Sequence, residues 1–351
     1  MNKLTIAYDA RFLRPKTSHW GVGVFIENVC TRLSDEFNLV GLSSGFPGAR
    51  QKSIRTWPSV SKMNILMFEV SPLVGGRFDV YWGTNHYLPQ ALDAPSLLTV
   101  HDLLLLNHFE HMRFGGFLAW RFRSSLRRAA KIVADSRTTA DDLLAEQPDL
   151  KGKIEVVPLG FGIPRLPATQ GSIDGLLPAA PYALMLGCHR PRKNAGLAIA
   201  AISQLRERGL DVQLVITGDI HPSFRRAAQA CPEAVTLLGV LPRSVLSKVL
   251  ERALCLLFPS RYEGFGFPLL EAMAAGCPVL ALDTPINHEV AAKAGCFLPE
   301  DPEKWATAIR RLMASDATRE EMKQLGFENL ARYSWEKTST AYAQMFRELA
   351  N

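Results

Sequence analysis

Short apolar runs alternate with longer amphipathic stretches along the chain. In the first half the apolar runs are KLTIAY, FNLVGL, FDVYWG, SLLTVHD, KIVADS and KIEVVPLG. Amphipathic segments at 22–36, 113–131 and 137–147 lie between them and are typical of helices. Strands that are apolar without interruption indicate a parallel sheet covered by helices on both faces. The first half therefore predicts an α/β domain.

A second alternation of the same kind follows an interruption. The segment 161–181, FGIPRLPATQGSIDGLLPAAP, is rich in proline, glycine and small residues and is typical of a linker. Beyond it the apolar runs are YALMLG, VQLVITG, AVTLLG, CLLFPS and PVLALD, and helices are expected at 194–208, 243–252, 268–275 and 302–314. A chain of 351 residues is long enough for two such domains.

Composition and charge narrow the class of protein. Hydrophobic residues make up 47% of the chain and charged residues 21%, which excludes a disordered or fibrous protein. Lysine and arginine number 40 against 34 acidic residues, and most of the resulting +6 lies in the first half. This mild excess is compatible with an anionic partner but is too weak to indicate nucleic-acid binding.

Other compositional features point to a cytoplasmic protein. The six cysteines form no CxxC pair, so we expect buried, reduced thiols. The N-terminus reaches charged residues too early for a signal peptide, and no apolar run approaches the roughly 20 residues of a membrane span. The sequence contains no D-x-D motif and no His/Cys cluster with ligand spacing, so we expect no metal and no other cofactor.

The segment 258–281, FPSRYEGFGFPLLEAMAAGCPVLA, carries the most informative motif. A strand is expected to end at Phe258, and a helix is expected to begin at Pro268 after a glycine-containing loop. Such a loop lets backbone N–H groups approach a ligand, and the N-terminus of a helix attracts anions. Glu263 and Glu271 can both reach a ligand bound at this loop and helix start, and both can accept hydrogen bonds from sugar diols. The alternative is an ordinary loop followed by a glutamate that favours the start of a helix.

A basic turn follows the predicted strand that ends at Gly187. Arg190, Arg192 and Lys193 come before a helix for which Asn194 is a suitable N-cap. Cations beside a helix start can hold a pyrophosphate. The alternative is a solvated basic turn.

Together these motifs resemble the retaining glycosyltransferases of family 4. The resemblance rests on LGxxxPRKN followed by PSxYEGFGxPxLEAMAxGxPV, and it extends over nearly the whole chain. Further stretches that resemble family blocks are YDARFL, GVGVFIENV, TVHDLLLL, IVADSRTTADDLL, IEVVPLGF and YSWEKTSTAYAQMF. The resemblance implies the α/β fold called GT-B, in which two tandem Rossmann-like domains face each other across a cleft.

The expected division follows from this fold. An N-terminal acceptor domain would span 1–165, a linker 166–180 and a C-terminal donor domain 181–334. The last helix, 335–351, would pack back on the N-terminal domain.

The resemblance also implies roles for residues of the donor half. Arg192 and Lys193 would bind the diphosphate of a nucleotide-sugar. Arg190 is a further candidate, because Cys188 stands where many relatives have an arginine. The other donor-half residues with implied roles are Glu271 at the ribose, Glu263 at the donor-sugar hydroxyls, Val240 and Leu241 at the base, and Gly264, Phe265, Gly266, Phe267, Leu269 and Leu270 at the sugar and phosphate.

In the acceptor half, Gly21 and Gly23 would bring the backbone against the β-phosphate. His101 would lie under the donor sugar near the transferred centre, and the neighbouring Asp102 could orient it. The alternative for His101 is a hydrogen-bonded structural residue at the end of a strand. The resemblance implies a front-face reaction in which the departing phosphate oxygen accepts the proton and His101 positions the sugar and stabilises charge.

The implied activity is that of a retaining, metal-independent hexosyltransferase. It would use a nucleotide-diphosphate sugar and a saccharide or lipid-linked saccharide acceptor in the synthesis of cell-surface polysaccharide or lipopolysaccharide. GDP-mannose is the first expectation for the donor, and UDP-glucose, UDP-N-acetylglucosamine and nucleotide-linked rhamnose stay open. The alternatives from other classes are a non-catalytic sugar-nucleotide-binding or scaffold protein and an NAD-dependent dehydrogenase, against which the incomplete glycine motif of GVGVFIENV argues.

The segment 112–131 combines basic and aromatic residues and contains no acid. Its basic residues are Arg113, Arg121, Arg123, Arg127, Arg128 and Lys131, and its aromatic residues include Phe117, Trp120 and Phe122. This pattern is typical of peripheral contact with an anionic membrane, here the inner face of the cytoplasmic membrane. A packed helix with a basic outer face is equally compatible. The small net charge argues against single-stranded nucleic acid.

Overall fold

The computed structural model describes residues 3–13, 21–44, 54–57, 78–89, 92–107, 115–162, 173 and 175–351. Residues 166–172 and 174 of the predicted linker 166–180 lie outside these residues, and Arg113 lies outside them as well. The chain forms two compact units, one of residues 1–160 together with 333–351 and the other of residues 161–332.

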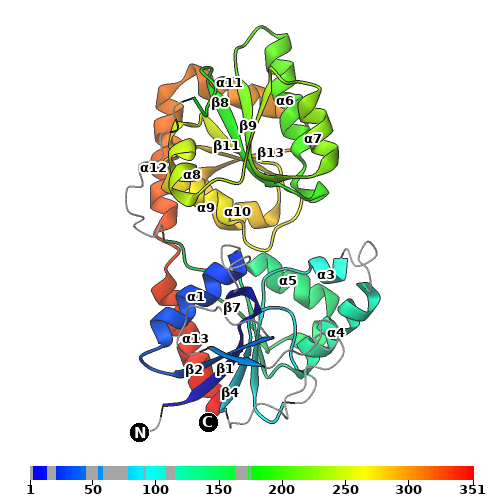
Figure 1. Cartoon of the computed structure of the whole chain (residues 1–351), viewed down its shortest axis with the longest axis vertical. Coiled ribbons are helices and arrows are strands. Elements are labelled where there is room, and N and C mark those ends of the chain that lie inside the picture. The colour runs from blue at the N-terminus through cyan, green and yellow to red at the C-terminus, as the bar shows by residue number, and fades with distance from the viewer. Residues whose placement is uncertain are drawn as a thin grey trace. The chain divides into compact units, whose positions relative to one another are not determined.

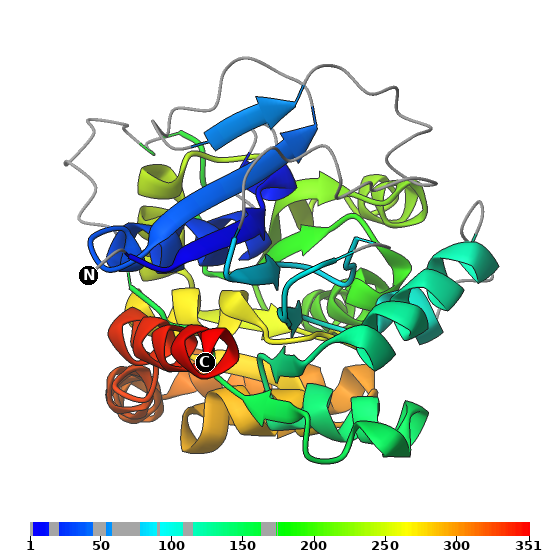
Figure 2. The ribbon, with the colours of Figure 1, turned by 90° about the horizontal axis from the view of Figure 1, so that it is seen from below.

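The first unit contains a parallel sheet of seven strands in the order β3-β2-β1-β4-β5-β6-β7. The strands are β1 (Thr5–Asp9), β2 (Asn38–Ser44), β3 (Ile54–Trp57), β4 (Val80–Gly83), β5 (Ser96–Val100), β6 (Lys131–Ala134) and β7 (Ile154–Val156). Every residue of β4 and β5 is buried, as unbroken apolar strands require. Figure 2 shows β3, β2 and β1 side by side in blue. The sequence pattern did not predict β3.

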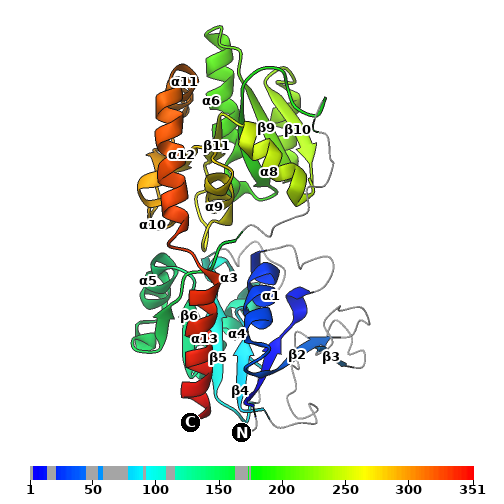
Figure 3. The same cartoon turned by 90° about the vertical axis from the view of Figure 1, so that its left-hand side faces the viewer.

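Helices cover both faces of this sheet. The helices are α1 (Gly21–Leu33), α3 (Leu104–Asn107), α4 (Gly115–Arg128), α5 (Arg137–Glu146) and α13 (Trp335–Ala350). Helices α4 and α5 pack on the face that carries Ala7, Tyr81 and Leu98. Helices α1 and α13 pack together on the opposite face (Figures 1 and 3).

The C-terminal helix completes an aromatic core in the first unit. Phe25 of α1 lies 5.5 Å from both Trp82 of β4 and Tyr342 of α13, measured between ring centroids. A Cβ atom on Gly160 would lie 2.3 Å from the backbone nitrogen of Trp335, so only glycine lets the chain pass there. The segment 333–351 is therefore an integral part of the first unit.

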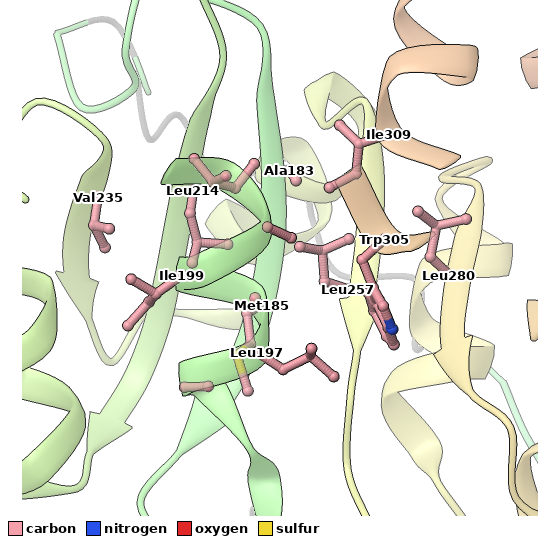
Figure 4. Packing of buried hydrophobic residues seen from close by; sticks show 14 of the residues in the cluster. Ala183, Met185, Leu197, Ile199, Leu214, Val235, Leu257, Leu280, Trp305 and Ile309 are labelled. Atoms are coloured by element: carbon pink, nitrogen blue, oxygen red, sulfur yellow. The ribbon is translucent and has the colours of Figure 1, made fainter. Parts of the chain in front are cut away.

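The second unit contains a parallel sheet of six strands in the order β10-β9-β8-β11-β12-β13. The strands are β8 (Tyr182–Cys188), β9 (Gln213–Ile220), β10 (Val235–Gly239), β11 (Cys255–Phe258), β12 (Val279–Leu282) and β13 (Gly295–Leu298). The helices are α6 (Ala195–Glu207), α7 (Pro222–Gln229), α8 (Arg243–Arg252), α9 (Phe267–Ala274), α10 (Pro285–Ala291), α11 (Pro302–Ala314) and α12 (Asp316–Leu330). Figure 4 shows Trp305 and Ile309 of α11 against Leu257 and Leu280 of the sheet.

The start of α6 differs from the prediction. Asn194 does occupy the N-cap, but its backbone is left-handed (φ 56°, ψ 39°) and its side chain makes no capping hydrogen bond. A capping side chain needs an extended backbone at this position, which Asn194 does not have. The turn instead directs the preceding Lys193 into a buried position.

Both sheets reverse their strand order beside the first strand of the unit. The reversal lies between β1 and β4 in the first unit and between β8 and β11 in the second. In parallel α/β sheets, ligands bind beyond the carboxyl ends of the strands at such a reversal. The loops after these strands are therefore where functional side chains are expected. Among the described residues, no helix is both long and apolar enough to span a bilayer.

Candidate active site

Lys193 and Glu263 meet where the strand order of the second unit reverses. Lys193 ends the short turn after β8, and Glu263 lies in the loop after β11. Lys193 Nζ is 2.6 Å from Glu263 Oε1, and each side chain is only 11% exposed. The Lys193 ammonium also lies 5.4 Å from the ring centroid of Phe258, the last residue of β11. Residues seventy positions apart thus form a nearly buried ion pair.

Arg192 binds the same carboxylate and joins the two loops. Its Nη1 lies 3.0 Å from Glu263 Oε2 and also donates to the carbonyl of Tyr262. The Arg192 carbonyl in turn accepts a hydrogen bond of 2.9 Å from the Arg261 backbone N–H. The turn after β8 and the loop after β11 are therefore one hydrogen-bonded structure.

The electrostatics of this cluster keep Glu263 ionised. Burial by itself raises the pKa of Glu263, but the charges of Lys193 and Arg192 outweigh burial and the pKa is lowered overall. The pKa of His189 is lowered by its partial burial and by the neighbouring Lys193, Arg190 and Arg192. Several cations therefore gather at the carboxyl edge of β8, with Glu263 and Asp219 as nearby counter-charges.

Arg190 and Cys188 occupy contrasting places in this turn. Arg190 is exposed and forms no ion pair with the residues that the structure describes. The Cys188 side chain is fully buried and belongs to the core against α6 and α11. A cation at position 188 would therefore point into the core, so Arg190 and Arg192 are the arginines of this turn that can reach an anion.

The loop after Glu263 presents its backbone to the same edge. Gly266 has φ 99°, a conformation that favours glycine, and it is the N-cap of α9. The side chains of Phe265, Leu269 and Leu270 are buried in the unit. Of the predicted residues 264–270, these three can contact a ligand only through their main chain.

Glu271 lies in α9, in a different environment from Glu263. Burial raises the pKa of Glu271, and Arg243 at the start of α8 offsets only part of this effect. Val240 and Leu241 link β10, the edge strand of the sheet, to α8, and Val240 is 71% exposed. Glu271 is therefore the carboxylate that lies toward the α8 side of the unit.

In the first unit the corresponding edge holds a histidine–aspartate pair. His101 follows β5, and its Nδ1 lies 2.5 Å from Oδ2 of Asp135, which follows β6. The other ring nitrogen, Nε2, lies 2.9 Å from the carbonyl oxygen of Thr84, which follows β4. His101 and Asp135 are both buried. Three neighbouring strand ends thus fix the imidazole.

The prediction that Asp102 orients His101 is wrong. The Asp102 carboxylate lies 3.6 Å from His86 Nε2 and accepts a hydrogen bond from the Leu104 backbone N–H. Successive residues of an extended segment point to opposite sides, so the sequence neighbour of His101 faces away from its ring. Asp135 was missed, although a carboxylate near the end of the predicted strand KIVADS was the signal that could have found it.

Gly21 and Gly23 form the first turn of α1, which follows β1. The N-terminus of α1 therefore lies at the same sheet edge as His101. Residues 14–20, which lead into this turn, are outside the described residues. The structure thus groups Arg192, Lys193 and Glu263 in the second unit, whereas His101, Gly21 and Gly23 belong to the first.

The side chains of the described residues offer no evident metal site. No group of three or more histidine, cysteine, aspartate or glutamate side chains among them has an arrangement that could hold a metal ion. All six cysteines are free thiols, and four of them are buried.

Comparisons with curated proteins identify relatives for most of the chain. O-antigen chain mannosyltransferase B of Escherichia coli is 26% identical over 284 residues, which are 77% of this chain and 74% of the relative. D-inositol 3-phosphate glycosyltransferase of Segniliparus rotundus is 27% identical over 62% of this chain and 52% of its own length. Serotype-specific mannosyltransferase WbdA of Escherichia coli is 25% identical over 69% of this chain, but only 34% of WbdA is aligned. This chain thus matches about half or less of the last two relatives.

Solved structures confirm the predicted GT-B fold. Sucrose-phosphate synthase from Thermosynechococcus elongatus has a TM-score of 0.78 at 19% identity, with 99% of each chain covered. WaaG, a glycosyltransferase involved in lipopolysaccharide biosynthesis, has a TM-score of 0.72 at 17% identity over 97% of this chain and 99% of its own. Anabaena HepE, solved in complex with UDP and glucose, has a TM-score of 0.73 at 15% identity, with 99% of this chain and all of HepE covered.

Two family models match separate halves of the chain. Residues 21–162 match the model described as Glycosyltransferase Family 4, and residues 180–315 match the model described as Glycosyl transferases group 1. The dehydrogenase alternative does not account for these matches. The motifs, the fold and both matches agree: the chain is a glycosyltransferase and belongs to family 4.

Proposed function

We propose that the protein transfers a hexose, with retention of configuration, from a nucleotide-diphosphate sugar to a saccharide or lipid-linked saccharide of a cell-surface polysaccharide. The observation that carries this proposal is the cluster of Lys193, Arg192 and Glu263 at the strand reversal of the second unit. Two cations next to the N-terminus of α9 suit a diphosphate. A carboxylate beside them suits the hydroxyl groups of the attached sugar.

Each donor contact is assigned to a residue of this edge. Lys193 and Arg192 bind the diphosphate, and Arg190 adds an outer cation. Glu263 binds hydroxyls of the transferred sugar, and Glu271 binds the ribose. The backbone of 264–267 approaches the sugar and phosphate, and the main chain at Val240 and Leu241 approaches the base.

The chemistry that these residues supply is electrostatic. The bond between C1 of the sugar and the phosphate oxygen breaks, and negative charge develops on the leaving diphosphate, where fixed cations stabilise it. A bond from the acceptor oxygen to C1 forms on the same face, and the acceptor's proton passes to the leaving phosphate oxygen. Because Lys193, Arg192 and the start of α9 already provide positive charge, we propose that the reaction needs no metal.

GDP-mannose is the donor that we propose first. Mannosyltransferases of O-antigen chains are among the relatives of this chain. UDP-glucose, UDP-N-acetylglucosamine and nucleotide-linked rhamnose are the alternatives, and one structural neighbour was solved with UDP and glucose.

Thermal-shift measurements followed by turnover assays test this function. A ligand that binds the folded state raises the melting temperature, and we expect GDP-mannose to do so more than UDP- or dTDP-sugars. Release of mannose or its transfer to an acceptor should then be detectable and should be lost in Glu263→Ala. If no nucleotide-sugar raises the melting temperature, the proposed donor site is wrong. Binding without turnover of any donor would favour the non-catalytic alternative.

The basic side chains of α4 and the adjoining Lys131 are less available to a membrane than the sequence suggested. Most of these side chains are engaged within the unit, so the segment is less cationic than its composition suggests. Arg121 is buried, Arg123 pairs with Glu146, Arg128 donates to the carbonyls of Leu88 and Pro89, and Lys131 at the start of β6 pairs with Glu348.

Two exposed aromatic rings lie on the outer face of α4. Phe117 and Trp120 are 39% and 53% exposed, and their rings stack with centroids 5.9 Å apart. Arg127 is exposed two turns further along the same face. We propose that these three side chains contact an anionic bilayer, with the rings in the interface and the guanidinium at the headgroups.

Sedimentation with vesicles that contain phosphatidylglycerol tests the bilayer contact. We expect the double variant Phe117→Ser/Trp120→Ser to lose vesicle binding. Phe327→Ser is the matched control, because Phe327 is 40% exposed on α12 and belongs to the other unit. Equal binding by both variants would exclude α4 as the contact.

A further inference from the structure

We propose that Asp135 is a positioning residue that holds His101 with a proton on each ring nitrogen, so that His101 contributes a fixed positive charge to glycosyl transfer and does not take the acceptor's proton. The inference rests on the proposed function, because it concerns what His101 can do in that reaction.

The hydrogen-bond geometry of the ring restricts the proton positions. Nε2 of His101 lies 2.9 Å from the Thr84 carbonyl oxygen, which can only accept, so Nε2 carries a proton. Nδ1 lies 2.5 Å from Asp135 Oδ2. A base needs a ring nitrogen with a lone pair directed at the substrate. Neither nitrogen of His101 offers one, because both are occupied by groups of the first unit.

The groups that face His101 favour the imidazolium over the neutral ring. Asp135 contacts the ring from the end of β6, and Asp102, although its carboxylate faces His86, adds a smaller effect through its charge. His86, which follows β4, pairs with Asp102. The Phe25 ring of α1 packs edge-on at 5.2 Å and contributes no charge.

His101 is the hydrogen-bond partner of the buried Asp135 carboxylate. The second carboxylate oxygen, Oδ1, is buried and accepts no hydrogen bond from the described part of the chain. The Tyr342 hydroxyl of α13 shares a hydrogen bond with the Thr99 hydroxyl, not with Asp135. A buried carboxylate with a single partner is costly unless that partner is charged. Burial alone lowers the pKa of His101, but the charge and hydrogen bond of Asp135 reverse this and raise it overall.

This arrangement decides where the acceptor's proton goes. His101 already holds both of its protons, so it cannot accept another. The proton of the acceptor hydroxyl must therefore leave with the departing phosphate oxygen while the new C1–O bond forms. His101 then acts only through its charge and through the rigid position that Asp135 and the Thr84 carbonyl give it.

Nitrogen-15 NMR of the histidine side chains in the whole protein tests the proton positions directly. The chain has eight histidines, and the variant His101→Gln assigns the signal. We expect both ring nitrogens of His101 to be protonated at pH 7, and to stay so above the ordinary histidine pKa of about 6.5. A single protonated nitrogen at pH 7 would overturn the proposal. This measurement needs no donor, so it stands even if the proposed donor is wrong.

The variant Asp135→Asn tests the positioning role. Asparagine keeps the size and an oxygen acceptor but removes the charge. We expect the pKa of His101 to fall by about one unit or more, which is a tenfold change in its protonation ratio. The loss of turnover with rising pH should then begin about one pH unit lower than in the parent enzyme, with little change in the KM for the donor.

Asp102→Asn is the matched control, because Asp102 faces His86 and not the ring nitrogens of His101. It should move the His101 pKa less than Asp135→Asn does. An unchanged His101 pKa and pH profile in Asp135→Asn, in a protein whose parent is active, would contradict the proposal. Absence of activity in the parent with every nucleotide-sugar would instead contradict the proposed function and leave the NMR result decisive for Asp135.

Discussion

Lys193 Nζ and Glu263 Oε1 are 2.6 Å apart, so the lysine that we assign to the diphosphate already has a carboxylate partner. A diphosphate that binds Lys193 and Arg192 has to compete with that carboxylate. A sugar attached to the diphosphate would in turn engage the displaced Glu263. A change at Glu263 is therefore expected to have opposite effects on the binding of the nucleotide diphosphate and on the turnover of the attached sugar.

Glu263→Gln should separate these two effects. Without the competing charge, the affinity for GDP alone should rise several-fold, whereas turnover of the nucleotide-sugar should fall by about 100-fold or more, as for loss of a key electrostatic contact. Calorimetric titration with GDP and a transfer assay measure the two quantities. Glu300→Gln is the control, because Glu300 is a surface acid paired with Arg261. Weaker binding of GDP to Glu263→Gln would show that Glu263 does not compete for the cations.

Glu271 predicts a pH dependence of nucleotide binding. Its pKa is raised above 4.5 by burial, and the ionised form is the one that accepts hydrogen bonds from a ribose. Affinity for GDP should therefore increase as pH rises through this raised pKa. Between the pKa of the unfolded chain and the raised pKa of the folded protein, Glu271 keeps a proton only in the folded state. The free energy of unfolding therefore decreases as pH rises through this interval.

Glu263 should not contribute to that pH window. Its pKa is lowered, so its ion pair stabilises the fold above the ordinary carboxyl range and is lost only in stronger acid. Titrations with GDP between pH 4.5 and 7 provide the measurement. The dependence should disappear in Glu271→Gln, and a dependence that survives in this variant would assign it to another group.

Arg190 and Arg192 should differ in what their removal changes. Arg192→Ala removes the bond to the Tyr262 carbonyl and one cation from Glu263, so both the melting temperature and GDP affinity should fall. Arg190→Ala should leave the melting temperature unchanged and weaken GDP binding several-fold, and more strongly at low salt. Arg226→Ala, an exposed arginine of α7, is the control. Unchanged GDP binding in Arg190→Ala would remove Arg190 from the donor site.

Gly160→Ala tests the close passage of the chain beneath α13. The added Cβ would lie 2.3 Å from the Trp335 nitrogen and 2.4 Å from its Cα, and backbone atoms cannot rotate away. We expect a loss of about 2–3 kcal/mol in the free energy of unfolding. Gly116→Ala is the control, because nothing lies within 4 Å of its added Cβ, and it should be neutral or slightly stabilising. Equal stability of the two variants would contradict the close approach.

The periodic features of the chain were predictable from sequence, but the partners of its charged groups were not. Unbroken apolar runs mark most of the strands correctly. The pattern predicted neither β3 (Ile54–Trp57), where Arg55 and Thr56 interrupt the apolar residues, nor β13 (Gly295–Leu298). Strand order is not encoded locally, so the sequence suggested Asp102 for His101, although the neighbouring strand supplies Asp135. The charge of the segment 112–131 could be counted, but Glu348, which pairs with Lys131, comes from 217 positions away.

The placement of α13 has a consequence for the biosynthesis of the protein. The first unit needs Tyr342 and Phe346 to close its aromatic core around Trp82. Residues 161–332, by contrast, have a complete core of their own by the time Arg332 is made. On the ribosome the second unit can therefore fold first, although it is encoded later than most of the first. The core of the first unit cannot be completed until α13 has been synthesised. A chain that ends before α13 would leave Trp82 and Phe25 without their contacts to Tyr342.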